Sequence, residues 1–131
     1  MRPMLCGLAM FGVIASGAGA LADPAGEAKL AQRLEGRTAG KPVNCISLHS
    51  VDSTEIIDKT AIVYRARGGK LYVNRPRSGA ESLDRHDVLV TKVVGSQLCD
   101  LDIVNLLDPS TRMSSGFVGL GDFVPYAKVG R

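Results

Sequence analysis

Short apolar runs separated by turn-forming residues fill the chain from residue 45 onward. The runs are rich in Val, Ile, Leu, Thr and Tyr, and Gly, Pro, Asp and Ser stand between them, which is typical of antiparallel β-strands. We therefore predict a mainly β domain, a small antiparallel barrel or sandwich, and favour the barrel because closure removes exposed strand edges. The predicted strands cover residues 45–51, 60–67, 70–75, 88–94, 103–107 and 117–124.

The clearest turn lies between the second and third predicted strands, at Gly68-Gly69. A two-residue glycine loop suits a primed turn, in which both central residues need a positive φ. Such a loop sets the register of the hairpin, which pairs Arg67 with Lys70, Ala66 with Leu71, Arg65 with Tyr72 and Tyr64 with Val73. Alternation along the strands then gives an apolar face made of Ile62, Tyr64, Ala66, Leu71 and Val73. The opposite face holds Val63, Arg65, Arg67, Lys70, Tyr72 and Asn74.

Three later segments have less regular patterns. Residues 88–94 are largely apolar at consecutive positions, which predicts a central strand covered on both faces. Residues 98–107 fit either a helix or a turn at 99–102 followed by a strand, and we favour the turn because Asp100 and Asp102 suit a bend. Glycines at 116, 119 and 121 predict bulges or sharp coiling in the last strand, and Pro125 predicts its edge or its end.

The segment before residue 45 predicts a short helix followed by a loop at 36–42. Asp23 can cap the helix, Pro24 suits its first position and Gly36 can end it. Leu30 and Leu34 share an apolar face, but this face is narrow, so we expect the helix to dock lightly.

Residues 1–22 have the three parts of a secretory signal peptide. Arg2 supplies positive charge, an apolar stretch follows, and Ala20-Leu21-Ala22 fits the rule for cleavage before Asp23. The alternatives are cleavage after Ala20 and a retained membrane anchor, although no Lys or Arg cluster follows the apolar stretch. We therefore expect a periplasmic or secreted protein with no transmembrane span after processing. Its parts are a signal peptide at 1–22, a short helix and loop at 23–44 and an antiparallel β domain at 45–131.

Export changes the charge and the cysteine count of the chain. The full sequence has 16 Lys and Arg against 13 Asp and Glu. Removal of Arg2 leaves 15 bases and a net charge of +2, which gives no case for specific nucleic-acid binding. Cys6 leaves with the leader, so Cys45 and Cys99 remain. In an oxidising compartment they predict one disulfide, with a pair of free thiols as the alternative.

No catalytic or metal-binding pattern stands out along the chain. Ser47 lies two residues before His49 without a nucleophile elbow, so polar strand residues are a simpler interpretation than a hydrolytic triad. His86 is flanked by charged residues, which is typical of a loop tip. The acids at 100 and 102 partly resemble a calcium loop but lack its glycine and its final Glu. We therefore assign no catalytic, metal or cofactor residues and expect no cofactor.

One cluster of basic residues is a candidate binding site. Residues 65–77 contain five Lys and Arg and no acid, and the predicted register places three of these on one face with Tyr72. Arginine pairs well with phosphate, sulfate or carboxylate, and Tyr adds a stacking surface. The alternative is a solvated hairpin face whose charges protect a strand edge. The predicted anion-binding residues are Arg65, Arg67, Lys70, Tyr72, Arg75 and Arg77.

Five short motifs follow one another between residues 45 and 126: CISL, EIIDKTAIVYR, LYVNRPR, GSQLCDLDIV and GFVGLGDFVPY. In this order they resemble a group of small exported, strand-rich proteins of unknown function from Gram-negative bacteria, with an early Cys and a Leu-Cys turn. Some members of that group carry a further Cys near the position of Gly79. Its absence here implies that Cys45 pairs with Cys99. The resemblance implies no activity, cofactor or site residue.

These observations leave three classes of function. We predict first a non-catalytic small β domain of the cell envelope that binds an anionic partner, an acidic glycan or a lipid headgroup, through the basic hairpin. The alternative is a protein-interaction module, an inhibitor or accessory subunit, that engages an envelope protein through an exposed apolar patch. The third class is a hydrolase, which would need a polar constellation in a pocket.

Overall fold

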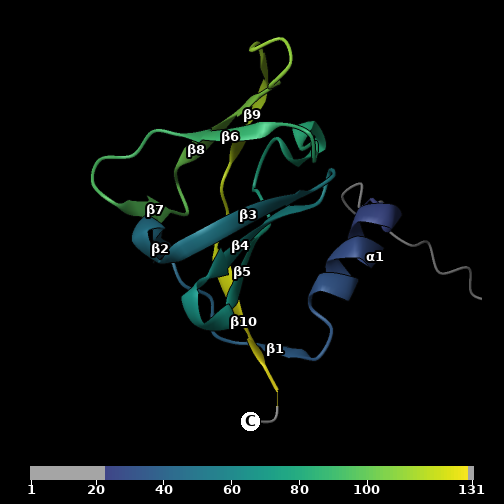
Figure 1. The fold of residues 1–131 in the computed structure, drawn as a ribbon, viewed down its shortest axis with the longest axis vertical. Helices are drawn as coiled ribbons and strands as arrows, with labels where there is room; N and C mark the ends of the chain where they lie inside the picture. The colour runs from purple at the N-terminus through teal and green to yellow at the C-terminus, as the bar shows by residue number, and fades with distance from the viewer. Residues whose placement is uncertain (1–22, 130–131) are drawn as a thin grey trace, which may run out of the picture.

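The computed structural model describes residues 23–129, which form one α-helix, three short 3-10 helices and ten β-strands (Figure 1). The helix α1 covers Pro24–Arg33, and η1, η2 and η3 cover Leu48–Ser50, Arg67–Gly69 and Ala80–Ser82. The strands are β1 (Arg37–Ala39), β2 (Cys45–Ser47), β3 (Val51–Ile57), β4 (Ala61–Ala66), β5 (Leu71–Asn74), β6 (Val88–Thr91), β7 (Gln97–Cys99), β8 (Ile103–Leu107), β9 (Ser114–Gly119) and β10 (Phe123–Lys128). The predicted signal peptide lies outside the described residues. Within 23–129, no helix is long and apolar enough to cross a bilayer.

All strand pairs are antiparallel, and they form three sheets. The largest sheet has the order β1-β10-β5-β4-β3, the second has the order β6-β8-β9, and β2 pairs with β7 alone. Strands β9 and β10 carry the chain from the second sheet into the largest one (Figure 1). The prediction of a mainly β, antiparallel domain with a short N-terminal helix is confirmed.

The main core lies between the largest sheet and the three-stranded sheet. Its buried side chains come from both, including Ile62 and Tyr64 of β4 and Leu106 of β8. Phe123 of β10 is fully buried, and its ring meets the Tyr64 ring edge-on, with 5.7 Å between the centroids. Two sheets around one core form a sandwich, so the barrel that we favoured from the sequence is the wrong one of the two predicted arrangements.

A second, smaller core lies on the other face of the largest sheet, under α1. Leu30 is only 1% exposed and packs with apolar residues of β3, β4 and β5. Asp23 caps the helix, because its Oδ2 accepts a hydrogen bond from Gly26 N at 3.2 Å. Gly26 lies so close to the β3–β4 turn that a Cβ there would collide with Thr60 Oγ1. The helix is therefore docked closely, not lightly as its narrow apolar face predicts.

The β4–β5 hairpin has a longer loop than the sequence predicts. Gly68 and Gly69 have positive φ angles of 82° and 84°, as predicted. However, the loop is the three-residue η2, and Ala66 N donates to Lys70 O at 2.8 Å across it. One additional loop residue moves every pairing in the hairpin by one position.

This shift exchanges the faces of β5 relative to β4. Arg65 lies opposite Leu71, and Tyr64 lies opposite Tyr72. Leu71 and Val73 pack under α1, while Tyr72 packs against the main core. The predicted division into one apolar and one polar face is wrong. Both faces of this sheet are covered, so alternation of apolar and polar residues does not determine the register.

Three other strand predictions need correction. The predicted strand 45–51 divides into β2, η1 and the start of β3, and β3 continues to Ile57 through mostly polar residues. The predicted strand 117–124 divides between β9 and β10, and β10 continues past Pro125 to Lys128. The predicted loop 36–42 contains β1, which pairs with β10 and so adds a strand to the largest sheet.

Strand β6 is an edge strand, not the predicted central one, because it pairs with β8 alone. On the outer face of its sheet, Val88, Ile103 and Phe117 are 46%, 57% and 60% exposed. Only the inner face of this sheet is covered. The prediction of a strand covered on both faces was wrong because apolar residues also lie on the exposed outer face. The predicted turn at 99–102 followed by a strand is confirmed. The predicted bulge is also present, as a register shift between β8 and β9 near Gly116.

The predicted disulfide is present. Cys45 of β2 and Cys99 of β7 lie directly opposite each other in the two-stranded sheet and are covalently joined. The bond links positions 54 residues apart in the sequence. It therefore ties the start of the β domain to the strand that precedes β8.

Candidate functional site

Two residues of the predicted anion-binding set, Arg75 and Arg77, are held by carboxylates. Arg75 Nη1 and Nη2 donate to the two oxygens of Glu27 at 2.6 and 3.0 Å, and this hydrogen bonding holds the pKa of Glu27 below its usual range. Arg77 Nη2 lies 3.2 Å from Asp100 Oδ2 and 3.5 Å from Asp122 Oδ1. Both guanidinium groups thus link β5 and its following loop to neighbouring elements.

The other four residues of the predicted set lie on different sides of the hairpin. Arg65 is exposed on the face that carries α1, whereas Tyr72 faces the main core. Arg67 belongs to the loop, and its Nη2 donates to His49 O at 3.1 Å. Lys70 Nζ lies 5.9 Å from the centroid of the Tyr72 ring, within the range of a cation–π contact. The structure therefore does not bring the six residues together on one face.

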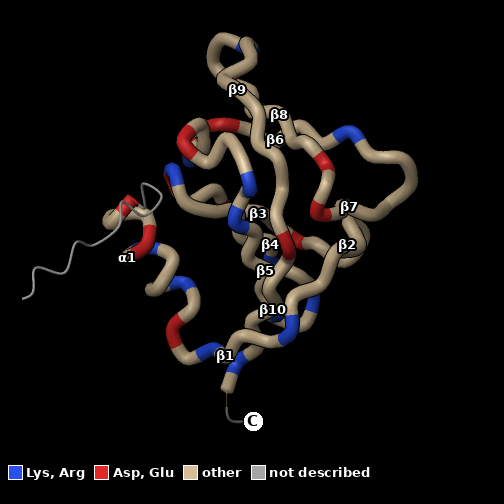
Figure 2. The backbone as a smooth tube through the Cα atoms, turned by 180° about the vertical axis from the view of Figure 1, so that it is seen from behind, with Lys and Arg blue, Asp and Glu red and all other residues tan. Residues whose placement is uncertain are grey.

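One end of the largest sheet brings together cations that are far apart in the sequence. Arg37 of β1 lies opposite Lys128 of β10, and Arg37 Nη1 donates to Gly69 O in the hairpin loop at 2.6 Å. Arg67 and Lys70 belong to or follow the same loop. Figure 2 shows Lys and Arg positions gathered at the end of the molecule that carries β1 and β10. We call Arg37, Arg67, Lys70 and Lys128 the basic end.

Carboxylates neutralise little of the basic end. Within residues 23–129, one acid lies within 4 Å of it, with Asp52 Oδ1 at 3.9 Å from Arg67 Nε. The two side chains are 55% and 76% exposed, so solvent screens their attraction. Arg37, Lys70 and Lys128 have no such partner in the described part of the chain. Their charge is therefore available to an anionic group from outside.

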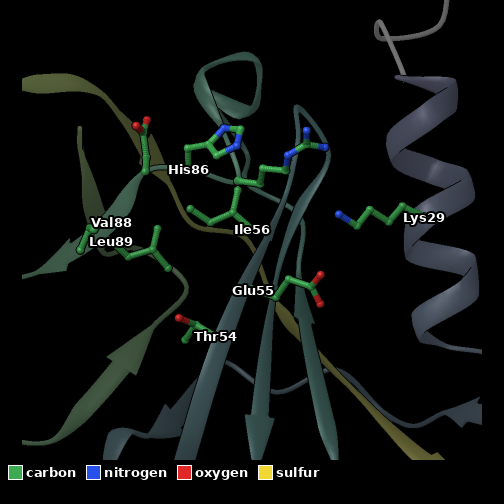
Figure 3. Close-up of a pocket in the computed structure, with 9 residues that line it drawn as sticks. Lys29, Thr54, Glu55, Ile56, His86, Val88 and Leu89 are labelled. Atoms are coloured by element: carbon green, nitrogen blue, oxygen red, sulfur yellow. The ribbon is translucent and has the colours of Figure 1, made fainter. Parts of the chain in front are cut away.

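A groove of about 540 Å³ lies between the largest sheet and the three-stranded sheet (Figure 3). It separates β3, the last strand of one sheet, from β6, the last strand of the other, and no ladder joins these two strands. The strand residues that line it are Thr54, Glu55 and Ile56 of β3 and Val88 and Leu89 of β6. Lys29 extends from α1 toward this groove (Figure 3). The sandwich is thus open along one seam.

Most charges around the groove are paired. Glu55 accepts hydrogen bonds from Arg33 Nε and Nη2 at 2.8 and 3.0 Å, and these bonds hold the pKa of Glu55 below its usual range. Arg85 Nη1 lies 3.7 Å from Asp58 Oδ2. Lys29 differs, because no carboxylate of residues 23–129 lies within 4 Å of its ammonium group.

The two histidines belong to separate parts of the fold. Ser47 ends β2 and His49 lies in η1, so the two do not share a strand face. His86 is exposed beside the groove, and its Nδ1 lies 3.0 Å from Asp84 Oδ1. The backbone N–H of His86 also donates to this carboxylate, and together these bonds lower the pKa of Asp84. Neither histidine hydrogen-bonds to a serine in the described residues.

The acids of the turn at 99–102 have structural partners. Asp102 Oδ2 accepts a hydrogen bond from Cys99 N at 2.7 Å, and Asp100 pairs with Arg77. No group of three or more His, Cys, Asp or Glu that could hold a metal ion occurs within residues 23–129. These acids therefore stabilise the turn and its surroundings.

Sequence reasoning missed both the basic end and the groove. Arg37 and Lys128 lie near the β4–β5 hairpin only because β10 pairs with both β1 and β5. No local sequence pattern predicts that pairing. The groove depends on which strands are left at the two sheet edges, and β3 itself was not predicted. Comparison of the chain with protein-family models, with curated proteins and with solved structures gave no match.

Proposed function

We propose that this chain is an exported, non-catalytic binding domain of the cell envelope that engages an anionic partner through the basic end. The observation that supports the proposal is the cluster of Arg37, Lys70 and Lys128, whose charges have no carboxylate within 4 Å in the described residues. Export is proposed from the pattern of residues 1–22. A cystine between Cys45 and Cys99 is in keeping with an oxidising compartment.

The basic end has the chemistry to recognise phosphate, sulfate or carboxylate groups. Arg37 is held in place by hydrogen bonds to Gly69 O at 2.6 Å and to Tyr126 O at 3.4 Å, so little side-chain entropy remains to be lost on binding. Lys70 and Arg67 are exposed and can adjust to the ligand. Because the net charge of the processed chain is small, attraction depends on this local cluster and falls steeply with added salt.

Two anionic probes test the proposal, and they distinguish the two sources of anionic groups. Heparin represents sulfated and carboxylated glycans, and vesicles containing phosphatidylglycerol represent lipid headgroups. We expect the charge reversal Arg67→Glu/Lys70→Glu to lower the salt concentration at which the protein elutes from heparin, or to abolish its sedimentation with vesicles. Both side chains are exposed, so the fold should persist.

The matched control is Lys92→Glu/Arg112→Glu, which changes the total charge equally at two exposed positions outside the basic end. Binding that is lost in the first variant and kept in the control supports the proposal. Equal loss in both variants would show that net charge alone drives binding, and no binding of the unmodified protein to either probe would also contradict it.

A further inference from the structure

We infer that the groove between β3 and β6 accepts an extended segment of a partner protein, which adds a strand to a free sheet edge and directs an acidic side chain toward Lys29. This inference concerns a different surface from the basic end and does not depend on it.

Both strands that border the groove have backbone groups that are free to bind another strand. Strand β3 pairs only with β4, and β6 pairs only with β8. In the described residues, the backbones of Thr54, Glu55, Ile56, Val88 and Leu89 make no further backbone hydrogen bonds. An exposed edge presents N–H and C=O groups at the spacing of a strand, and an extended polypeptide is the ligand that satisfies them in series.

The groove is preformed, because cross-connections fix both of its ends. At one end, Lys59 N donates to Leu83 O at 3.1 Å and Arg85 N donates to Asp58 Oδ1 at 2.6 Å. Beyond the other end, Leu48 N donates to Ser96 O at 2.7 Å. These bonds hold the edges apart at a set distance, so binding need not first open the sandwich.

The inner side of the groove favours an apolar side chain on the incoming strand. Ile56 is 6% exposed and belongs to the main core, and Leu89 packs against that core. Thr54 is exposed beside them. Since side chains alternate along a strand, one apolar residue can face Ile56 and Leu89 while its neighbours face outward.

The charges of the groove select an acidic residue next to that apolar one. Glu55 is already held by Arg33, and Arg85 lies beside Asp58. Two lining charges lack an ion-pair partner within 4 Å in the described residues, Asp87 next to β6 and Lys29 on the β3 side, and Lys29 is the one that can pair with an acidic side chain. Figure 3 shows Lys29 extending from α1 toward the β3 side of the groove. An Asp or Glu of the bound segment would pair with Lys29, at a site where solvent screens the attraction only in part.

Selection from a phage-displayed library of random ten-residue peptides, performed at 150 mM salt, is the test. We expect selected peptides to alternate apolar and polar residues and to contain Asp or Glu. In ¹⁵N-labelled protein, the selected peptides should slow hydrogen exchange of amides at the edge that they join, in residues 54–56 of β3 or 88–89 of β6. Failure to select any peptide, or protection elsewhere on the molecule, would overturn the inference.

A charge swap tests the role of Lys29. In Lys29→Glu, the affinity for a selected acidic peptide should fall about tenfold, and the same peptide with Lys in place of its acid should regain it. The control Lys92→Glu makes the same charge change at a residue that does not line the groove. It should leave the affinities for the acidic peptide and for the Lys peptide unchanged. Loss without rescue by the Lys peptide would contradict the assignment of Lys29.

Two further measurements distinguish a bound partner segment from binding at the basic end and from self-association. Arg67→Glu/Lys70→Glu should bind the selected peptides as well as the unmodified protein does, so the two proposals can fail independently. If the unmodified protein dimerises in analytical ultracentrifugation with protection of the same β3 or β6 amides, the occupant is a second copy and the inference is wrong.

Discussion

The side-chain amide of Asn74 makes two hydrogen bonds to the backbone of Gly121. Asn74 Nδ2 donates to Gly121 O at 2.7 Å, and Asn74 Oδ1 accepts from Gly121 N at 2.9 Å. Asn74 is fully buried at the end of β5, and Gly121 lies in the short connection between β9 and β10. One side chain thereby satisfies both backbone groups of a residue at the junction of the two large sheets.

Replacement of Asn74 by Leu should therefore be costly. It leaves a buried N–H and a buried C=O without partners, at about 1–3 kcal/mol each, so we expect a loss of about 3 kcal/mol in the free energy of unfolding. Urea denaturation followed by circular dichroism measures this loss. Asn105→Leu, at an exposed position of β8, is the control and should change stability by less than about 1 kcal/mol. Equal effects in both variants would refute the role of the amide.

Removal of the disulfide should also destabilise the fold. The chain-entropy model gives about 4 kcal/mol for a loop of this length. Cys45→Ser/Cys99→Ser, and the unmodified protein treated with a reductant, should unfold at similarly lowered urea concentrations. Agreement between the two preparations would assign the loss to the bond. A reduced protein as stable as the oxidised one would contradict the prediction.

Gly26 should not tolerate a side chain, although it lies inside a helix where Ala is otherwise preferred. A Cβ at this position would collide with Thr60 Oγ1 and lie 2.7 Å from Asp58 O. Overpacking of this kind costs about 1–3 kcal/mol, which exceeds the helix propensity gained, so we expect net destabilisation of Gly26→Ala. Thermal unfolding compares it with Gln32→Ala on the exposed side of α1, which should change little.

Two carboxylates should make stability fall at acidic pH. Hydrogen bonds from Arg75 and Arg33 lower the pKa values of Glu27 and Glu55 in the folded state. A lowered pKa adds stability that is complete above the unfolded-state pKa of about 4.3 and is lost as pH falls through the folded value. Because these acids are 38% and 34% exposed, the total effect should be about 1 kcal/mol.

A urea denaturation series between pH 3 and pH 7 measures this dependence. The free energy of unfolding should be level above about pH 5 and decline below it. Arg33→Gln/Arg75→Gln should flatten the decline, whereas Lys92→Gln should retain it. An unchanged pH profile in the double variant would exclude these ion pairs as its source.

The Tyr64 hydroxyl is the buried side-chain polar atom without a hydrogen-bond partner in the described residues. Burial raises the pKa of this phenol, so the group stays neutral in the folded protein. Tyr64→Phe removes the unpaired hydroxyl and keeps the ring contact with Phe123, so we expect stability to be equal or higher by about 1 kcal/mol. A loss of stability in thermal unfolding would show that the hydroxyl has a partner of its own.

The sequence predicts the elements of this fold better than it predicts their arrangement. The strands at 60–67 and 70–75 and the turn at 99–102 follow from local patterns and are confirmed. The hairpin register is not predictable in the same way, because Val63 and Leu71 lie under α1 while Tyr64 and Tyr72 face the main core. Where both faces of a sheet are covered, alternation of apolar and polar residues does not indicate which side of a strand faces α1 and which faces the main core.

The candidate sites depend on contacts between distant parts of the chain. Arg67 and Lys70 were identified from the sequence, but Arg37 and Lys128 required the pairing of β1, β10 and β5. Strand β3 was missed because its exposed residues from Asp52 to Thr54 are polar. Its polarity reflects its place at a sheet edge, which is also what makes it part of the groove.

The central position of β10 has a consequence for the order of folding. Among the described strands it comes last in the sequence, yet it lies between β1 and β5 in the largest sheet. A ribosome must therefore synthesise the other nine described strands before that sheet can be completed. Late completion of the sheet would favour the export that we propose, because a chain that folds late is still unfolded when it reaches a translocation channel.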